Sequence, residues 1–389
     1  MKKSTFNSLG SNYNFAFAIK TLFLSEKNNR LKDVLEKKYD GKVFLTYKGR
    51  EAISLILKSL TLPAGSKVAI NGFTCLAVFQ AVTSAGYQPI LLDTDKNKLN
   101  FSAKSLVETI KTDPNIKVVI VQNTFGFESD ISEIKKNCQQ NKLILIEDLA
   151  HNAGLQYKTG EEFGTVGDFV ALSFSRDKMI DAISGGAAIF RNQNKLPEID
   201  FANISLWQKI VDRFYPLHTV FIRKIYPTGI GKYYHFALKK MGLIPKSMMA
   251  ADDKIHRLPN FYAALAEDQL NIAKRDLARR QKIGNLYLAS IDKKFLLDEN
   301  YFQPLTRFPI ITHNRKKLLG KFRANNIFLD DIWYDWPIAP KKYADDSVYQ
   351  MGQCPNAEKL SGEILNLPTH QNISEETAEK IIKIINEER

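Results

Sequence analysis

The chain has 389 residues, of which 44% are hydrophobic and 25% are charged, and its formal net charge is +13 at pH 7. A chain of this length buries a large core and is expected to form two domains. No apolar run reaches the roughly 18 residues that a membrane span needs, and the first residues are too polar for a signal peptide.

Residues 1–40 form a mixed polar segment with a helical pattern from Asn29 to Lys38, and they resemble nothing specific. Residues 44–53, FLTYKGREAI, then predict a strand, a glycine turn at Gly49 and Arg50, and the start of a helix. Such a turn exposes backbone N–H groups to an anion, and the helix dipole adds to the attraction. A lone glycine turn is more often an ordinary loop, so this feature needs support from other motifs.

Further apolar runs alternate with helical patterns up to about residue 190. Residues 68–75 and 89–93 predict strands, and residues 118–126 predict a buried strand that ends in polar groups and a glycine. Strands that alternate with helices predict a mostly parallel sheet with helices on both faces, which is the α/β class. We therefore assign residues 41–200 to a large domain.

Two strand ends in this domain offer a carboxylate and an amine to one crevice. Residues 143–146 are the apolar run of a strand buried on both faces, and Asp148 follows at its carboxyl end. A second strand, residues 169–174, contains Ser173 near its end, and Lys178 follows in a turn that closes on two glycines. Open α/β sheets bind their ligands at this edge.

An amine and a carboxylate so placed suit pyridoxal phosphate chemistry. A lysine holds the cofactor aldehyde as a Schiff base, and an aspartate opposite the ring nitrogen keeps the pyridinium protonated as an electron sink. The cationic pyridinium would keep Asp148 ionised, although burial raises the pKa of a carboxyl group. The spacing alone leaves an alternative equally open, in which Asp148 caps a helix and Lys178 lies on the surface.

Residues 201–250 carry much of the excess positive charge. They hold eight basic residues against one acid, and eight minus one gives +7 of the total of +13. Apolar residues recur there at helical spacing, and Pro216 is expected to interrupt the helix. The basic residues are Lys209, Arg213, Arg223, Lys224, Lys232, Lys239, Lys240 and Lys246, the acid is Asp212, and the apolar residues are Trp207, Ile210, Val211, Phe214, Leu217, Phe221 and Ile225.

Two interpretations of this basic amphipathic insert remain open. It lies on an anionic membrane surface, where each cation contributes roughly 1 kcal/mol, or it packs in a dimer or domain interface with a solvated basic face. The net charge also indicates an acidic partner or surface. No nucleic-acid recognition motif accompanies the charge, so we expect no nucleic-acid partner.

Residues 251–389 are expected to form a smaller C-terminal α+β domain with its connecting helix. The connecting helical pattern extends to about Tyr287. A strand at residues 309–311, a helix at 316–325 and an extended stretch at 327–336 follow, and a final helix begins at Ser374.

Three motifs around the two strand ends carry a family resemblance. They are EDLAHNAG at residues 147–154, GTVGD at 164–168 and SFSRDK at 173–178, with a pair of glycines beyond. Their order and spacing resemble those of the DegT-type sugar aminotransferases, a branch of the fold type I pyridoxal phosphate enzymes. The resemblance covers about residues 42–385, with the insert excepted.

The resemblance implies a role for each residue of these motifs. Lys178 would carry the cofactor and act as the catalytic base, and Asp148 would face the ring nitrogen. His151 would lie by the ring and its phenolic oxygen, with a structural histidine as the alternative. The cofactor phosphate would lie on Gly49, Arg50 and Ser173, where Arg50 replaces the more usual hydroxyl with a charge-assisted contact.

Several positions depart from the family pattern. Cys75 stands where an aromatic residue usually stacks on the ring, so either its polarisable thiol or the nearby Phe73 would supply that surface. A buried core cysteine is the alternative for Cys75. Asn123 stands where histidine is frequent, and we place it with Phe73 among the candidate substrate contacts. The asparagine that reaches the partner subunit's phosphate falls on Ile255, leaving Lys254, His256 or Arg50 to replace it.

The activity implied is a ping-pong transamination by a cytoplasmic homodimer. Glutamate is the expected amino donor, and a keto-sugar, most simply nucleotide-linked, is the expected acceptor, in polysaccharide or related glycan biosynthesis. The isolated Cys75, Cys138 and Cys354 have no metal-ligand spacing and favour a reducing compartment. The alternative is a cofactor-binding paralogue with little turnover that docks on a membrane surface or a complex. The insert would make either protein peripheral to the inner face of the membrane.

Overall fold

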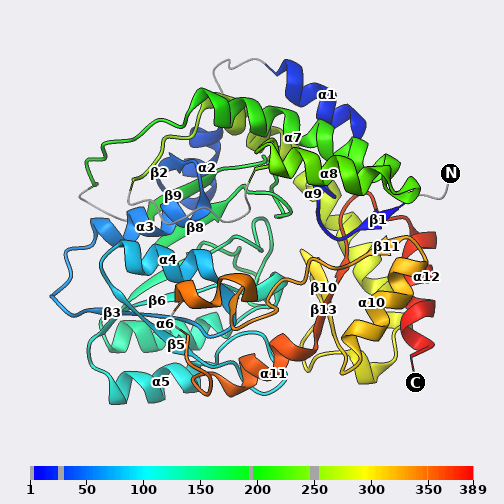
Figure 1. Cartoon of the computed structure of the whole chain (residues 1–389). Coiled ribbons are helices and arrows are strands. Elements are labelled where there is room, and N and C mark those ends of the chain that lie inside the picture. The colour runs from blue at the N-terminus through cyan, green and yellow to red at the C-terminus, as the bar shows by residue number, and fades with distance from the viewer. Residues whose placement is uncertain (1–3, 25–29, 192–195, 246–253, 348, 389) are drawn as a thin grey trace.

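The computed structural model describes residues 4–24, 30–191, 196–245, 254–347 and 349–388. Lys246, the expected helix start at Asn29 and the expected domain boundary at residue 250 lie outside the described residues. Figure 1 shows a sheet with helices on the left and a smaller unit on the right, which contains the carboxyl terminus.

A seven-stranded sheet forms the centre of the large unit, in the order β2-β9-β8-β7-β6-β3-β5. Only β9 runs against its neighbours, so the prediction of a mostly parallel α/β sheet is confirmed. The strands are β2 (Gly41–Thr46), β3 (Lys67–Asn71), β5 (Gln88–Leu92), β6 (Ile116–Val121), β7 (Ile144–Asp148), β8 (Phe169–Ser173) and β9 (Gly186–Arg191).

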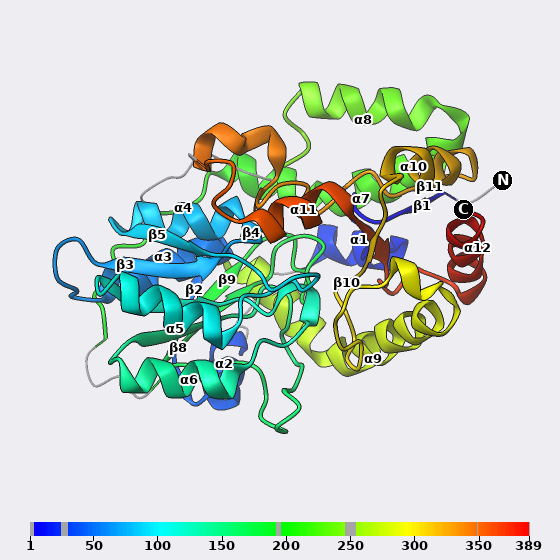
Figure 2. The ribbon, with the colours of Figure 1, turned by 90° about the horizontal axis from the view of Figure 1, so that it is seen from below.

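Helices cover both faces of this sheet because alternate strand residues point to opposite sides. One face packs Val118, Ile120 and Ile146 against α3 (Gly49–Ser59) and α4 (Leu76–Ser84). The other packs Val119 and Leu145 against the remaining helices of the domain. These are α2 (Leu31–Tyr39), α5 (Ala103–Thr112) and α6 (Ile131–Gln140), and Figure 2 shows the sheet between the two helical layers.

The smaller unit is built on the antiparallel pair β10 (Arg307–Ile311) and β13 (Ile364–Pro368). The 31-residue helix α9 (Asn260–Ser290) leads into it from the sheet. Its other helices are α10 (Arg315–Ala324), α11 (Pro355–Glu363) and α12 (Glu375–Asn386). Two short parallel pairs connect it to earlier parts of the chain: β1 (Thr5–Phe6) with β11 (Ile327–Phe328), and β4 (Thr74–Cys75) with β12 (Ile338–Ala339).

The insert forms α7 (Leu206–Ile225) and α8 (Ile230–Lys240), and α7 packs between α8 and α1 (Phe15–Phe23). The expected interruption at Pro216 is wrong, because α7 continues through it. Tyr215 and Thr219 are buried on either side of Pro216, and the Thr219 hydroxyl donates to the Pro216 carbonyl. This packing holds the turn in helical form although proline lacks an N–H.

Candidate active site

The carboxyl edge of the sheet brings Asp148, Ser173 and Lys178 into one region, as expected for neighbouring parallel strands. Asp148 is the last residue of β7 and Ser173 the last of β8, and β7 pairs with β8. Asp148 is buried, whereas Ser173 and Lys178 are half-buried. Lys178 lies on the loop between β8 and β9 and is close enough to Asp148 for their charges to interact.

Glu147 explains why two of the motifs occur together. Its buried carboxylate accepts the N–H groups of Gly164, Val166 and Gly167 at 2.6–2.9 Å, and the Tyr157 hydroxyl at 2.8 Å. A buried carboxylate needs such donors to offset its lost hydration. Glu147, in the motif at residues 147–154, therefore holds the motif at residues 164–168 against the end of β7, next to Asp148.

His151 and Lys178 form the central contact of the site. The Phe125 N–H donates to Nδ1 of His151 at 3.1 Å, so a neutral ring carries its proton on Nε2. That Nε2 lies 2.9 Å from Nζ of Lys178. Burial lowers the pKa of both groups, and the positive charge of Lys178 further lowers the pKa of His151. The two groups therefore form a hydrogen bond in which His151 Nε2–H donates to a neutral, nucleophilic Lys178 amine.

Burial shifts the pKa of the Asp148 carboxyl group in the opposite direction to that of His151 and Lys178. Burial raises its pKa to about 6, while the Ala150 N–H, at 3.0 Å, and the charge of Lys178 act in the opposite direction. A cation placed against this carboxylate would restore the ionised form. Asp148 is therefore suited to hold a protonated ring nitrogen.

The first turn of α3 packs closely against Ser173. A Cβ atom on Gly49 would lie 2.7 Å from Cβ of Ser173, and a Cβ atom on Gly186 would lie 2.7 Å from Cα of Gly49. Only glycines allow this approach, which leaves the first turn of α3 beside the Ser173 hydroxyl. A phosphate bound there would receive backbone N–H groups and the positive end of the helix dipole.

Two cations that the motifs did not single out lie near this turn. Nζ of Lys48 donates to the Ser184 hydroxyl at 2.9 Å, and the guanidinium of Arg176 lies 5.0 Å from the centre of the Tyr215 ring. Burial lowers the pKa of Lys48 to about 8, and the charges of Arg176 and Arg50 contribute to this shift. Lys48, Arg50 and Arg176 therefore lie close enough for their positive charges to repel one another, and a bound anion would offset this repulsion.

The smaller unit supplies an aromatic and basic wall opposite the strand ends. Trp333 stacks on His151 with ring centres 5.3 Å apart, and Nζ of Lys178 lies 4.5 Å from the centre of the Trp333 ring. Arg307 covers Trp333, at 3.8 Å from the ring centre, and pairs with Asp331 at 3.0 Å. The aromatic run at residues 333–336 was a signal for this wall, but it lies too far along the chain to be assigned without the fold.

The candidate residues Cys75, Phe73 and Asn123 differ in how far they are buried. Cys75 is half-buried, and a negative charge on it would raise the pKa of Lys178. Phe73 is fully buried and packs on Tyr334 with ring centres 4.9 Å apart. Asn123 is also fully buried, and its side chain contacts the Tyr157 hydroxyl and the Ser129 N–H. Phe73 and Asn123 therefore border the site through their neighbours.

Ile255 lies in the core that covers α3 and α4. Its neighbour His256 binds Glu51 through its backbone N–H and through Nδ1, both at 3.1 Å. The Glu51 carboxylate also accepts the N–H of Tyr47. This network stabilises the start of α3 from within the chain.

The N-terminal segment holds the loop that carries Lys178. Asn12 donates to Asp181 at 2.9 Å and the Tyr13 hydroxyl donates to the same carboxylate at 2.5 Å, while Ser11 donates to Asp177. This contact could not be predicted from the sequence, because the partners are more than 160 residues apart.

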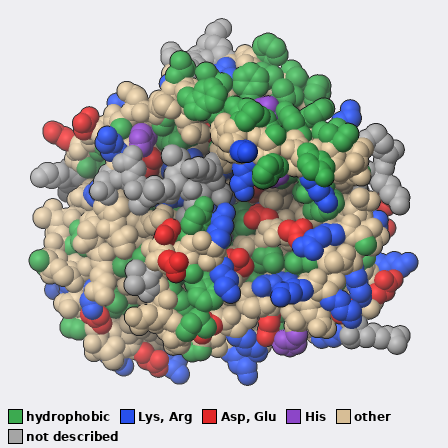
Figure 3. All heavy atoms as spheres, in the orientation of Figure 1, with side chains coloured by type: hydrophobic (Ala, Val, Ile, Leu, Met, Phe, Trp, Pro, Cys, Tyr) green, Lys and Arg blue, Asp and Glu red, His purple; other side chains and the backbone are tan. Residues whose placement is uncertain are grey.

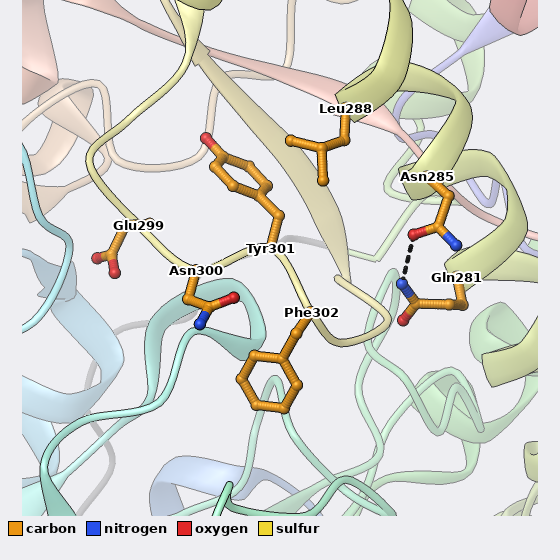
Figure 4. Close-up of a pocket in the computed structure, with 7 residues that line it drawn as sticks. All are labelled: Gln281, Asn285, Leu288, Glu299, Asn300, Tyr301 and Phe302. Carbon is orange, nitrogen blue, oxygen red and sulfur yellow. Dashed lines mark hydrogen bonds between the residues drawn. The ribbon is translucent and has the colours of Figure 1, made fainter.

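A hollow of about 720 Å³ lies apart from these residues, between α9 and the loop before β10 (Figure 4). It is open to solvent, and Gln281 donates to Asn285 across one side at 2.7 Å. It is lined by Gln281, Asn285, Leu288, Glu299, Asn300, Tyr301 and Phe302, and contains none of the groups at the strand ends.

The residues present fit pyridoxal phosphate. Asp148 suits the ring nitrogen, Lys178 suits the aldehyde, and the first turn of α3 with its nearby cations suits the phosphate. Together with the sheet, they define a pyridoxal phosphate-dependent transaminase of fold type I.

Comparisons with known proteins agree with this class. The family model of the DegT/DnrJ/EryC1/StrS aminotransferases matches residues 26–212 and 234–386. The chain belongs to this family.

Individual relatives are distant but match most of the chain. A dTDP-3-amino-3,6-dideoxy-alpha-D-galactopyranose transaminase of Aneurinibacillus thermoaerophilus is 24% identical over 87% of this chain and 83% of its own length. A UDP-2-acetamido-2-deoxy-3-oxo-D-glucuronate aminotransferase of Pseudomonas aeruginosa is 23% identical over 89% and 85%. The crystal structure of DesV from S. venezuelae has the same fold, with a TM-score of 0.73 at 18% identity and full coverage of both chains.

Proposed function

We propose that this transaminase moves an amino group from glutamate to the keto group of a nucleotide-linked sugar. The observation that carries the proposal is the contact between His151 and Lys178 beside Asp148, at the carboxyl edge of the sheet. The acceptor class is supported by relatives whose names specify sugars linked to dTDP and UDP. Such a product would enter polysaccharide or related glycan biosynthesis.

Each residue has a distinct task in the proposal. Bound pyridoxal phosphate supplies an electron sink for the carbon that gains or loses the amino group. Nζ of Lys178 would hold the cofactor aldehyde and would carry the proton to and from the donor's alpha carbon. His151 Nε2–H keeps that amine neutral and oriented, because its hydrogen bond needs the amine lone pair.

The other groups fix the cofactor. Asp148 would pair with the ring nitrogen, while Gly49, Arg50 and Ser173 would hold the phosphate with help from Lys48 and Arg176. Cys75 would contact the ring, and Trp333 would limit the access of water. Because Lys48 and Arg176 come from the same chain, the phosphate site has cations even though Ile255 replaces the usual asparagine. We infer a homodimer from the family and assign no site residue to the partner subunit.

The experiment is a spectroscopic half-reaction. Purified protein with added pyridoxal phosphate is expected to show a visible band, which glutamate shifts to shorter wavelength with release of oxoglutarate. Lys178→Ala should lack the band of the covalently held cofactor, whereas the control Lys282→Ala, at an exposed lysine of α9, should keep both responses. A panel of dTDP-, UDP- and GDP-linked keto-sugars, each supplied with excess glutamate, then identifies the acceptor as the sugar that sustains the release of oxoglutarate from glutamate.

Two results would contradict the proposal. Failure to bind pyridoxal phosphate would exclude the roles of Asp148 and Lys178. A bound cofactor that ignores glutamate and every other amino acid would favour a cofactor-holding protein with little turnover.

A further inference from the structure

The surface of α1, α7 and α8 exposes an unusual concentration of large apolar side chains. We call this surface the outer face. Eleven of the sixteen exposed large apolar side chains in the described part of the chain belong to it. They are Phe15, Phe23, Leu206, Trp207, Ile210, Phe214, Phe221, Ile230, Tyr233, Phe236 and Met241. Figure 3 shows apolar side chains gathered at the top of the molecule, where Figure 1 draws these helices.

The exposed residues of α7 form one helical stripe. Trp207, Phe214 and Phe221 recur every seven residues and are 57%, 41% and 47% exposed. The opposite side of the helix, which includes Tyr215 and Ile222, is buried. The stripe of Trp207, Phe214 and Phe221 therefore points to solvent, whereas Val211 of the same apolar pattern is buried. Exposed apolar patches of this kind mark interaction sites in soluble proteins.

The charges around this stripe have one sign. Lys224, Lys232, Lys239 and Lys240 are exposed on α7 and α8. The single acid of the three helices, Asp212, is buried and bound by Tyr47, Tyr262 and Gln208. Lys20 of α1 pairs with Asp268 of α9. The outer face thus combines aromatic side chains with lysines and exposes no carboxylate among its described residues.

We propose that the outer face docks on an anionic lipid bilayer surface. Aromatic rings enter the boundary between headgroups and acyl chains, and lysines attract anionic headgroups, so this composition matches such a surface. A two-fold contact with a second copy would set the same lysines against each other without any acid to pair with them.

The family model matches only part of this surface. Its match leaves out residues 213–233, which include most of α7 and the start of α8. Four of the eleven apolar residues of the outer face lie in this unmatched stretch: Phe214, Phe221, Ile230 and Tyr233. Docking also stands apart from the proposed transamination, because it uses no residue of the active site.

The test is co-sedimentation with vesicles. The full-length protein loaded with pyridoxal phosphate is mixed with vesicles of phosphatidylcholine alone, or of an equimolar mixture of phosphatidylcholine and phosphatidylglycerol. We expect binding to the mixed vesicles, weaker binding to phosphatidylcholine, and a decrease when salt screens the lysines.

Two sets of substitutions separate the apolar and electrostatic contributions. The first is Trp207→Ser, Phe214→Ser and Phe236→Ser, with Phe302→Ser in the hollow of Figure 4 as control. The second is Lys232→Gln, Lys239→Gln and Lys240→Gln, with Lys104→Gln, Lys111→Gln and Lys282→Gln on α5 and α9 as control. Each outer-face set is expected to lower the partition coefficient by about tenfold or more, and each control by less than about twofold.

Circular dichroism and the visible cofactor band confirm that each variant is folded and loaded. No binding to the mixed vesicles, or binding that both outer-face sets leave unchanged, would overturn the proposal. A protein that ignores vesicles, and whose dimer dissociates when the three apolar residues are replaced, would assign the outer face to a second copy. Loss of transamination with intact vesicle binding would reject the proposed function alone.

Discussion

The carboxyl edge of the sheet and the outer face of α1, α7 and α8 differ in whether their side chains find partners within the chain. At the sheet edge, buried groups such as Glu147 and His151 have hydrogen-bond partners within the chain. On the outer face, rings such as Trp207 and Tyr233 lie in solvent. The first region is specified by short motifs, whereas the second is specified by the side of a helix that the fold leaves uncovered.

Helix α7 contains this difference within a single element. Its inner side buries Asp212, which accepts the hydroxyls of Tyr47 and Tyr262 at 2.5 and 2.8 Å. Its outer side exposes Trp207 and Phe214. Burial here follows from hydrogen-bond partners and not from hydrophobicity alone, because a paired carboxylate is satisfied in the interior.

The largest effect is expected at the sheet edge. Lys178→Ala should lower kcat by roughly a thousandfold or more, because the variant loses both the covalent attachment of the cofactor and the proton carrier. The release of oxoglutarate from glutamate in a single turnover measures this step in the wild type and in the variant. A variant that retains a tenth of wild-type turnover would show that another group carries the proton.

The inner side of α7 should be sensitive for a structural reason. Asp212→Ala leaves two buried tyrosine hydroxyls without their acceptor, so we expect a loss of about 3–4 kcal/mol of unfolding free energy. Urea unfolding monitored by circular dichroism measures it, with the exposed Asp200→Ala as the matched control. Equal stability of the two variants would mean that neither hydroxyl depends on Asp212.

Asp148 should make the stability of the cofactor-free protein depend on pH. Burial raises its pKa from 3.8 to about 6 in the folded chain, so the folded state binds more protons between these values. The contribution is fully present below about pH 4 and is lost as pH rises to 6, which corresponds to roughly 3 kcal/mol. Asp148→Asn should remove this part of the dependence of the unfolding free energy on pH. Bound cofactor should reduce the same dependence, because its ring cation favours the ionised carboxylate. An unchanged slope in the variant would assign the titration to another carboxyl group, such as Asp181.

Much of the sheet edge could be predicted from the sequence. Asp148 and Ser173 lie at strand ends, with Lys178 on the loop that follows Ser173, because buried parallel strands have continuous apolar runs that end at polar residues. Trp333 and Arg307 could not be predicted, since they enter the site from another unit through long-range packing. The same holds for Asn12 and Tyr13, whose bonds to Asp181 depend on the path of the N-terminal segment.

The insert shows a second limit of prediction from the sequence, which concerns the orientation of a helix. Helical periodicity located the stripe of Trp207, Ile210 and Phe214, but periodicity does not say which side of a helix meets the core. The tyrosine partners of Asp212, Tyr47 and Tyr262, decide that here, and they are 50 residues or more away in sequence. Helix α7 also continues through Pro216, because its neighbours are fixed by burial.

The smallest effect is expected on the outer face, where it separates docking from folding. Trp207→Ala should change the unfolding free energy by less than about 1 kcal/mol, since the side chain is 57% exposed. Ile222→Ala, on the buried side of the same helix, should cost about 2–4 kcal/mol because it leaves a cavity. Thermal and urea unfolding of the two variants make the comparison within α7. A large loss for Trp207→Ala in dilute monomeric protein would mean that the ring stabilises the fold itself, and the difference between the two sides of α7 would then disappear.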